Sequence, residues 1–199
     1  DLAWSRGLGD VYKRQVEFGT TGFSQGSGSI TNTSTNPLSV TALTANTSYD
    51  FYVRAVCGVG DSSAWVGPLS FITPCASYTP NYLEDFSTYV PSCWEEAADG
   101  LPATGATGLG VSEWGATNYL NGVGIQNATK INMYNVGTND WLLSPTFDLS
   151  AGGWELVINA GVTTWNGSGS ITMGSDDSVQ VLISTNGGTC LLYTSPSPR

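Results

Sequence analysis

The side chains that carry most acid–base and nucleophilic catalysis are scarce in this chain. Its 199 residues include no histidine, which excludes Ser-His-Asp and Cys-His nucleophile activation and histidine-containing zinc sites. Cys57, Cys75 and Cys93 are spaced too widely for a CxxC metal knuckle, and no glycine-rich phosphate loop lies between a strand pattern and a helix pattern. The sequence therefore predicts a protein that is not an enzyme.

Acidic side chains are the remaining group that could support catalysis. Glu95, Glu96 and Asp99 are close in sequence, and a glycosidase needs two carboxyl groups that flank one bond. Adjacent residues of a strand point to opposite faces of the sheet, so Glu95 and Glu96 cannot flank one bond. An acidic loop in solvent is the better interpretation.

Carboxylates also bind calcium, which takes about six to eight oxygen ligands. Asp176 and Asp177 precede an alternating strand pattern, and Glu84 and Asp85 lie in the expected first strand of the second module. If these strands are neighbours, the four carboxylates could form a calcium site. The alternative is that all four are surface acids.

Aromatic rings raise a carbohydrate-binding hypothesis, because flat aromatic faces stack on sugar rings. Most tryptophans in β-sandwiches belong to the core, and the apolar neighbours of Trp141 and Trp154 predict that role for them. Trp114 and Trp165 lie in loops rich in Gly, Asn and Thr and are the predicted ligand-binding residues. The full set considered is Trp94, Trp114, Tyr119, Trp141, Trp154 and Trp165.

Both ends of the chain resemble translated sequencing-library adaptor. With one choice of codons, residues 5–15 (SRGLGDVYKRQ) and residues 190–199 (CLLYTSPSPR) are readings of opposite strands of one short DNA. Scars of this kind are excluded from fold reasoning. Residues 1–15 and 190–199 are therefore assigned to adaptor, and the natural reading frame is expected to continue past both ends.

The remaining part, residues 16–189, is strongly acidic. It holds two basic side chains, Arg54 and Lys130, against fourteen carboxylates. Such a surface repels phosphate backbones and anionic lipid, so binding to nucleic acid or adsorption to a membrane is disfavoured. No apolar run is long enough to span a bilayer. Short β-branched runs separated by Gly, Ser, Thr and Asn predict an all-β fold.

Residues 16–74 carry the strand patterns of a first module. Residues 49–57 (YDFYVRAVC) alternate between two faces, which predicts a half-buried strand. Shorter strands are predicted at residues 16–19, 38–42 and 69–73.

This first module resembles a fibronectin type III domain that lacks its first two strands. Leu43, six residues before Tyr49, has the spacing of a tyrosine corner, in which the phenol bonds to upstream backbone. Ser63-Ala-Trp65 and residues 67–73 (GPLSFIT) match the segment that follows. The resemblance implies half of a β-sandwich.

The cysteines at the ends of the predicted strands cannot all pair with one another. Cys57 and Cys75 would lie at opposite ends of neighbouring strands, roughly 25 Å apart, which is too far for a disulfide. We expect a disulfide between Cys75 and Cys93, and a partner for Cys57 in sequence lost near the N-terminus. The alternative is three buried thiols.

Residues 75–189 form a second module with four motifs in order. They are E-D-F-S at 84–87, P-x-C-W at 91–94, D-W-L-L-S-P-x-F-D-L at 140–149 and D-D-x-V-Q-V-L-I-S-T-x-G-G at 176–188. Strands are predicted at residues 82–86, 154–158 and 177–184, and Asn186-Gly187 predicts a hairpin turn whose returning strand is absent.

Together these motifs resemble choice-of-anchor J and cleaved-adhesin domains, which are MAM-like jelly rolls of secreted Bacteroidota proteins. The resemblance implies an extracellular β-sandwich. MAM-like relatives often bind calcium, which here would involve Glu84, Asp85, Asp176 and Asp177.

The sequence as a whole predicts a non-catalytic binding or adhesion module, outside the cell or on a bacterial cell surface, whose partner is a glycan or a protein. The alternative is an accessory or spacer region of a secreted peptidase or glycoside hydrolase. A sorting domain or a hydrolase domain beyond the ends would discriminate between them.

Overall fold

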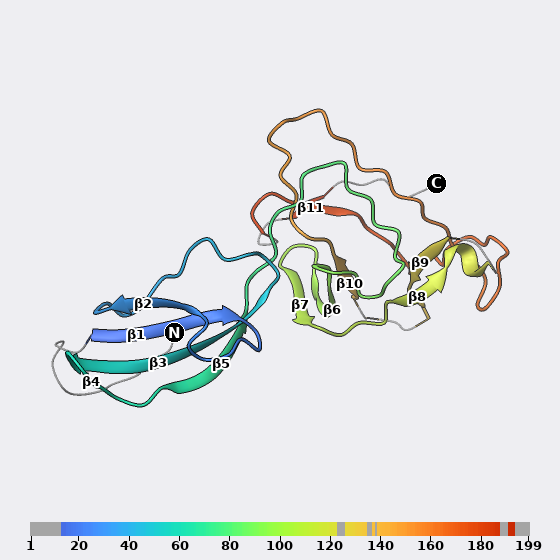
Figure 1. Ribbon diagram of the computed structural model, residues 1–199. Coiled ribbons are helices and arrows are strands. Elements are labelled where there is room, and N and C mark those ends of the chain that lie inside the picture. The colour runs from blue at the N-terminus through green and yellow to red at the C-terminus, as the bar shows by residue number, and fades with distance from the viewer. Residues whose placement is uncertain (1–12, 123–125, 135–136, 138, 188–190, 194–199) are drawn as a thin grey trace. The chain divides into compact units, whose positions relative to one another are not determined.

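The chain forms antiparallel β-sheets in two compact units. The computed structural model describes residues 13–122, 126–134, 137, 139–187 and 191–193. The units are Asp1–Ala76 and Ser77–Arg199, and they are called unit 1 and unit 2 below. Apart from one 3₁₀ turn, η1 (Tyr119–Asn121), the regular elements are strands (Figure 1). The all-β fold class is confirmed. Within the described residues, no helix has the length and apolar character to cross a bilayer.

Unit 1 contains one antiparallel sheet with the strand order β2-β1-β3, and β4 and β5 both pair with the outer side of β3. The predicted strand at residues 49–57 is the central strand β3, and the predicted strand at residues 69–73 corresponds to most of β5. The elements are β1 (Lys13–Thr20), β2 (Ser29–Thr33), β3 (Ser48–Gly58), β4 (Asp61–Ser62) and β5 (Val66–Ile72).

Strand β1 begins inside the segment assigned to adaptor. Lys13, Arg14 and Gln15 continue the ladder with β3, and the Gln15 side chain accepts a hydrogen bond from Arg54 Nε at 2.8 Å. Backbone pairing depends little on side-chain identity at the end of a strand. A sequence of any origin can therefore extend the ladder.

Two features of unit 1 differ from the sequence prediction. Residues 38–42 are not a strand, although Leu38 and Val40 are half-buried as the alternation predicted. A strand exists only where a neighbour supplies hydrogen bonds, and none of the described strands lies beside this segment. Conversely, β2 was missed because its residues, S-I-T-N-T, lack an apolar alternation.

The tyrosine corner is present. The backbone N–H of Thr44 donates a hydrogen bond to Tyr49 Oη at 3.1 Å, and Tyr49 is buried while its ring stacks on Phe71. The bond ties the segment before β3 to the sheet across the bend at residues 45–46.

The β1–β2 loop is closed over two buried carboxylates. Glu17, which is 1% exposed, accepts hydrogen bonds from the N–H groups of Gly26 and Gly28 at 2.7 and 2.9 Å. Asp50 accepts one from the N–H of Gly22 at 2.8 Å and one from Ser70 Oγ at 2.6 Å. Buried carboxylates are stable only when such donors replace water.

Unit 2 holds three small antiparallel sheets with the pairings β10-β6-β7, β8-β9 and β11-β12. The predicted D-W-L-L segment contributes β10, and β12 lies in the segment assigned to adaptor. The elements are β6 (Glu95–Leu101), β7 (Gly105–Leu109), β8 (Gly115–Asn118), β9 (Asn127–Lys130), β10 (Trp141–Leu143), β11 (Leu182–Ser184) and β12 (Leu191–Tyr193).

Several strands predicted in unit 2 are not formed. Residues 82–86, 154–158 and 177–181 have no ladder, and only Leu182–Ser184 of the last motif is a strand. Figure 1 shows the stretch around residues 150–160 as an orange coil without arrows. The alternation in these segments has no neighbouring strand to satisfy its backbone groups. The returning strand, predicted to be absent, is β12, which pairs with β11.

An aromatic cluster packs the start of unit 2. The ring of Tyr82 lies 4.9 Å from that of Tyr78 and 5.3 Å from that of Phe147. Trp94 Nε1 donates a hydrogen bond to Tyr82 Oη at 2.9 Å. The backbone of Tyr78 bonds to that of Thr146 and Asp148. Segments far apart in the sequence are thereby joined.

Candidate functional site

The most exposed tryptophan in the described chain sits at the tip of a short hairpin. Thr163 and Ser170 form an antiparallel bridge, and the N–H of Thr164 donates to the carbonyl of Gly169 at 3.1 Å. The turn between them closes through the N–H of Gly167 and the carbonyl of Thr164 at 3.0 Å. A left-handed residue, Asn166, with φ of 52°, allows this tight reversal.

Asn121 braces this hairpin from a different part of the chain. Its Nδ2 donates hydrogen bonds to Thr163 Oγ1 and to the carbonyl of Gly167, both at 2.9 Å. Leu120 and Asn121 both have left-handed backbones, with φ of 55° and 53°. That conformation costs asparagine little. One amide therefore holds the hairpin at two points, Thr163 at its base and Gly167 at its turn.

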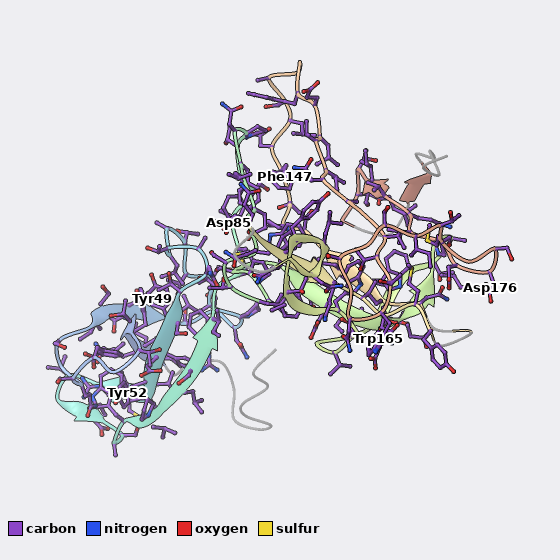
Figure 2. All side chains as sticks on the ribbon, turned by 90° about the vertical axis from the view of Figure 1, so that its right-hand side faces the viewer. Tyr49, Tyr52, Asp85, Phe147, Trp165 and Asp176 are labelled. Atoms are coloured by element: carbon purple, nitrogen blue, oxygen red, sulfur yellow. The ribbon has the colours of Figure 1, made fainter. Side chains whose placement is uncertain are left out.

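Trp165 is 72% exposed at this braced tip. Figure 2 labels it on unit 2. The hairpin from Val162 to Ile171 contains no charged residue, and its side chains offer hydroxyl and amide groups. A large, solvent-exposed ring on a fixed loop can stack on a flat apolar face of a ligand. The neutral polar groups beside it can hydrogen-bond to hydroxyls of that ligand.

The other predicted ligand-binding residue, Trp114, lies differently. Trp114 is half-buried and its Nε1 is shielded from solvent. It immediately precedes β8, whereas the hairpin of Trp165 is anchored by Asn121 beyond the other end of that strand.

The two tryptophans predicted to be core also differ from each other. Trp141 is half-buried on β10, with its Nε1 shielded. Trp154 is 40% exposed, so its predicted core role was wrong. Its segment has no ladder and therefore no sheet face to pack against.

The four predicted calcium ligands lie in two separate places. Glu84 accepts hydrogen bonds from Tyr82 Oη at 2.6 Å and from the N–H of Phe86 at 2.9 Å, and Asp85 accepts one from the N–H of Ser87 at 2.9 Å. The bonds from Ser87 lower the pKa of Asp85. Figure 2 shows Asp85 and Asp176 on opposite sides of unit 2.

The described residues hold no group of three or more His, Cys, Asp or Glu side chains arranged for a metal ion. Asp176 and Asp177 belong to a turn that is closed by a bond from the N–H of Asp177 to the carbonyl of Gly174. Because Asp85 and Asp176 lie on opposite sides of unit 2 (Figure 2), the described residues do not bring the four carboxylates together in one site.

The carboxylates considered for glycosidase chemistry lie on strand β6, so their interpretation as an acidic loop was wrong. Glu95 is exposed and its neighbour Glu96 is half-buried on β6. Glu96 Oε2 accepts hydrogen bonds from Tyr89 Oη at 2.7 Å and from Ser112 Oγ at 2.8 Å. Burial, helped by the bond to Glu96, raises the pKa of Tyr89 to about 12.

The comparisons with known proteins add no relative. No family model, no curated protein and no solved structure matches this chain. The function proposed below therefore depends on the side chains described above.

Of the cysteines, Cys75 and Cys93 are disulfide-bonded and Cys57 is an exposed free thiol. Cys57 is the penultimate residue of β3. That Cys75 and Cys93 bond to each other stays a prediction from the sequence.

Asn121 is the residue of the site that sequence reasoning missed. Its two acceptors lie 42 and 46 residues away, and nothing local distinguishes it from the other asparagines. The signal that was available is the Asn-Gly step at 121–122, which marks a turn. It does not reveal what the turn holds.

Proposed function

We propose that this chain is a non-catalytic extracellular binding module that recognises neutral carbohydrate through Trp165. The observation that carries the proposal is an indole 72% exposed on a hairpin whose base is fixed by the Asn121 amide. Exposing such a ring to water is unfavourable, and a braced tip limits the ordering cost of binding.

Charge supports a neutral ligand over an anionic one. The chain carries a formal net charge of −10, and a field of that sign repels uronate or sulfate groups as it repels phosphate. The hairpin itself is uncharged and carries Thr, Asn and Ser side chains. Hydroxyls of a neutral sugar can therefore form hydrogen bonds with these uncharged side chains.

The architecture supports the proposal that this module is extracellular and part of a protein with several modules. The order β2-β1-β3-β5 and the Thr44–Tyr49 bond agree with a sheet and corner of the fibronectin type III type. Disulfide-bonded cysteines agree with an oxidising, extracellular compartment. Both favour a surface-exposed, multi-module protein.

Affinity electrophoresis through gels that contain neutral polysaccharides, such as glucans and xylans, tests the proposal. Retardation of the intact chain is expected in at least one neutral gel and not in a polyuronate gel. Trp165→Ala should abolish it, and Trp165→Phe should retain part of it because the ring remains.

Trp154→Ala is the matched control, because it removes another exposed indole that lies outside the hairpin. It should bind like the parent chain. Loss of binding in both variants would point to a general effect of removing tryptophan. Binding that survives Trp165→Ala would contradict the proposal. If the same hairpin binds a protein tightly and binds no sugar, the partner of this module is a protein and not a carbohydrate.

A further inference from the structure

The loop between β1 and β2, residues 21–28, covers two carboxylates on one face of the unit 1 sheet. The loop contains no charged side chain, and its residues are exposed apart from Phe23 and Gly28, which are half-buried. The carboxylates that it contacts are buried: Glu17 is 1% exposed and Asp50 is 7% exposed. The loop therefore shields two acidic groups from water while burying little of itself.

Three backbone N–H groups of the loop donate to these carboxylates. Gly26 and Gly28 both donate to Oε1 of Glu17, at 2.7 and 2.9 Å. Gly22 donates to Oδ2 of Asp50 at 2.8 Å. A hydrogen bond to an ionised acceptor is about twice as strong as one to a neutral acceptor. The negative charge of the two side chains therefore contributes much of the free energy that holds the loop closed.

One ring contact adds to these bonds. Phe23 packs edge-on against Tyr52, with ring centroids 5.6 Å apart. The fit is close, because a Cβ at Gly28 would lie 2.5 Å from the Phe23 ring and 2.7 Å from the carbonyl oxygen of Phe18. By contrast, β1 pairs with β3 along its whole length. A loop with few apolar contacts opens at a lower free energy than the ladders beside it.

No opposing charge holds the two carboxylates in their ionised form within the described part of unit 1. The other titratable side chains that the register places on this face are Lys13, Tyr52 and Arg54. Arg54 Nε donates to Gln15 at 2.8 Å, and its guanidinium lies 4.5 Å from the centre of the Trp65 ring. Strands β2 and β5 contain no charged residue. The hydrogen-bond donors are therefore what stabilises the buried charges.

We propose that protonation of Glu17 and Asp50 releases the β1–β2 loop from the sheet, while the ladders of unit 1 stay paired. Protonation removes the charge that all three N–H groups face, and the bonds that remain are the weaker, neutral kind. The bonds from Ser70 and Gly22 lower the pKa of Asp50, so its contribution is lost as the pH falls through a value below 3.8. Release of the loop also separates its ring contact with the sheet.

Amide hydrogen exchange of the full chain, followed residue by residue by NMR from about pH 7 to about pH 3, tests the proposal. Protection is corrected for the intrinsic exchange rate at each pH. In acid, the protection of the Gly22, Gly26 and Gly28 amides should fall at least about tenfold. The ladder amides of β1 and β3 should keep theirs. Simultaneous loss of protection in loop and ladders would mean that acid unfolds the whole unit, and would overturn the proposal.

Glu17→Gln tests the role of the charge at neutral pH. The variant keeps a carbonyl oxygen as acceptor and lacks the charge, so Gly26 and Gly28 should show the low protection that the parent chain shows in acid. Asp61→Asn is the matched control, because it removes an exposed carboxylate of the same unit and should leave the loop protected. Equal protection of the loop in Glu17→Gln and the parent chain would contradict the proposal.

Gly28→Ala is the second variant, for the case that Glu17→Gln does not fold. Its Cβ would collide with the Phe23 ring and with backbone, so the loop should open with both carboxylates intact. The Gly22 and Gly26 amides should then have low protection at neutral pH, and acid should lower it no further. Gly58→Ala is the control, since a Cβ there meets nothing within 4 Å. A further fall in acid in Gly28→Ala would show that the acid effect does not act through release of the loop.

Discussion

The backbone N–H of Thr44 donates to Tyr49 Oη at 3.1 Å. This bond joins the segment before β3 to the sheet. Replacing Tyr49 by Phe removes the acceptor and leaves the ring stacked on Phe71. We expect Tyr49→Phe to lower the free energy of unfolding of unit 1 by about 1 kcal/mol.

Urea unfolding followed by circular dichroism measures this loss. Tyr52→Phe is the control, because it removes a phenol oxygen from the opposite face and keeps the ring packed against Phe23. Equal stability of Tyr49→Phe and the parent chain would show that the corner bond does not contribute.

Asp50 makes unit 1 sensitive to acid. The bond from Ser70, and then the bond from the Gly22 N–H, lower its pKa below the usual 3.8. A carboxyl whose pKa is depressed on folding stabilises the fold above its unfolded pKa, and this stability is lost as the pH falls through the folded pKa. We therefore expect unit 1 to lose stability as the pH falls below 3.8.

Ser70→Ala removes the largest cause of that shift. In a plot of melting temperature against pH, the fall of the melting temperature on the acid side should therefore be smaller in this variant. Ser27→Ala, in the same unit, should leave it unchanged, because the Ser27 hydroxyl bonds to Ser24 and not to a carboxylate. An unaltered acid limb in Ser70→Ala would contradict the assignment.

Tyr89 should titrate late in alkali. Its pKa is raised from 10.0 to about 12 by burial and by the bond to Glu96. A raised folded pKa gives stability that is complete below the unfolded pKa and is lost as the pH rises through the folded one. The loss is thus expected between pH 10.0 and about 12.

Ultraviolet titration of the phenolates checks this order. Tyr89→Phe should remove a late-ionising group. Loss of an early-ionising group from Tyr89→Phe would mean that the phenol is not held by Glu96.

Calcium should not stabilise this chain. The carboxylates of Glu84 and Asp85 accept local donors, and Asp176 lies on the other side of unit 2 (Figure 2). We expect the melting temperature to be the same with calcium and with a chelator. A rise in calcium that Asp176→Asn abolishes would show that the two pairs converge on an ion.

Local patterns predicted the elements whose ladders are closed by near neighbours. The alternation at residues 49–57 gave β3, and the spacing of Leu43 and Tyr49 gave the corner bond. Residues 154–158 have an equally good alternation and are not a strand. Strand formation requires a partner, and a single segment carries no information on whether one is present.

The residues of the candidate site also include some that the sequence could identify and some that it could not. Loop composition singled out Trp114 and Trp165 alike, and of these Trp165 is 72% exposed whereas Trp114 is half-buried. Ligand binding by either residue stays a prediction. Trp154 was assigned wrongly, because burial depends on what packs against a side chain. Asn121 could not be found, because its role arises from acceptors more than forty residues away.

The most direct test of the account is the affinity of the parent chain and of Trp165→Ala for one neutral oligosaccharide, chosen from the gel retardation and measured by calorimetry. We expect Trp165→Ala to bind at least about tenfold more weakly, since removing a stacked ring costs roughly 1.4 kcal/mol or more, and Trp154→Ala to bind like the parent chain. Equal affinities in the parent and in Trp165→Ala would contradict it.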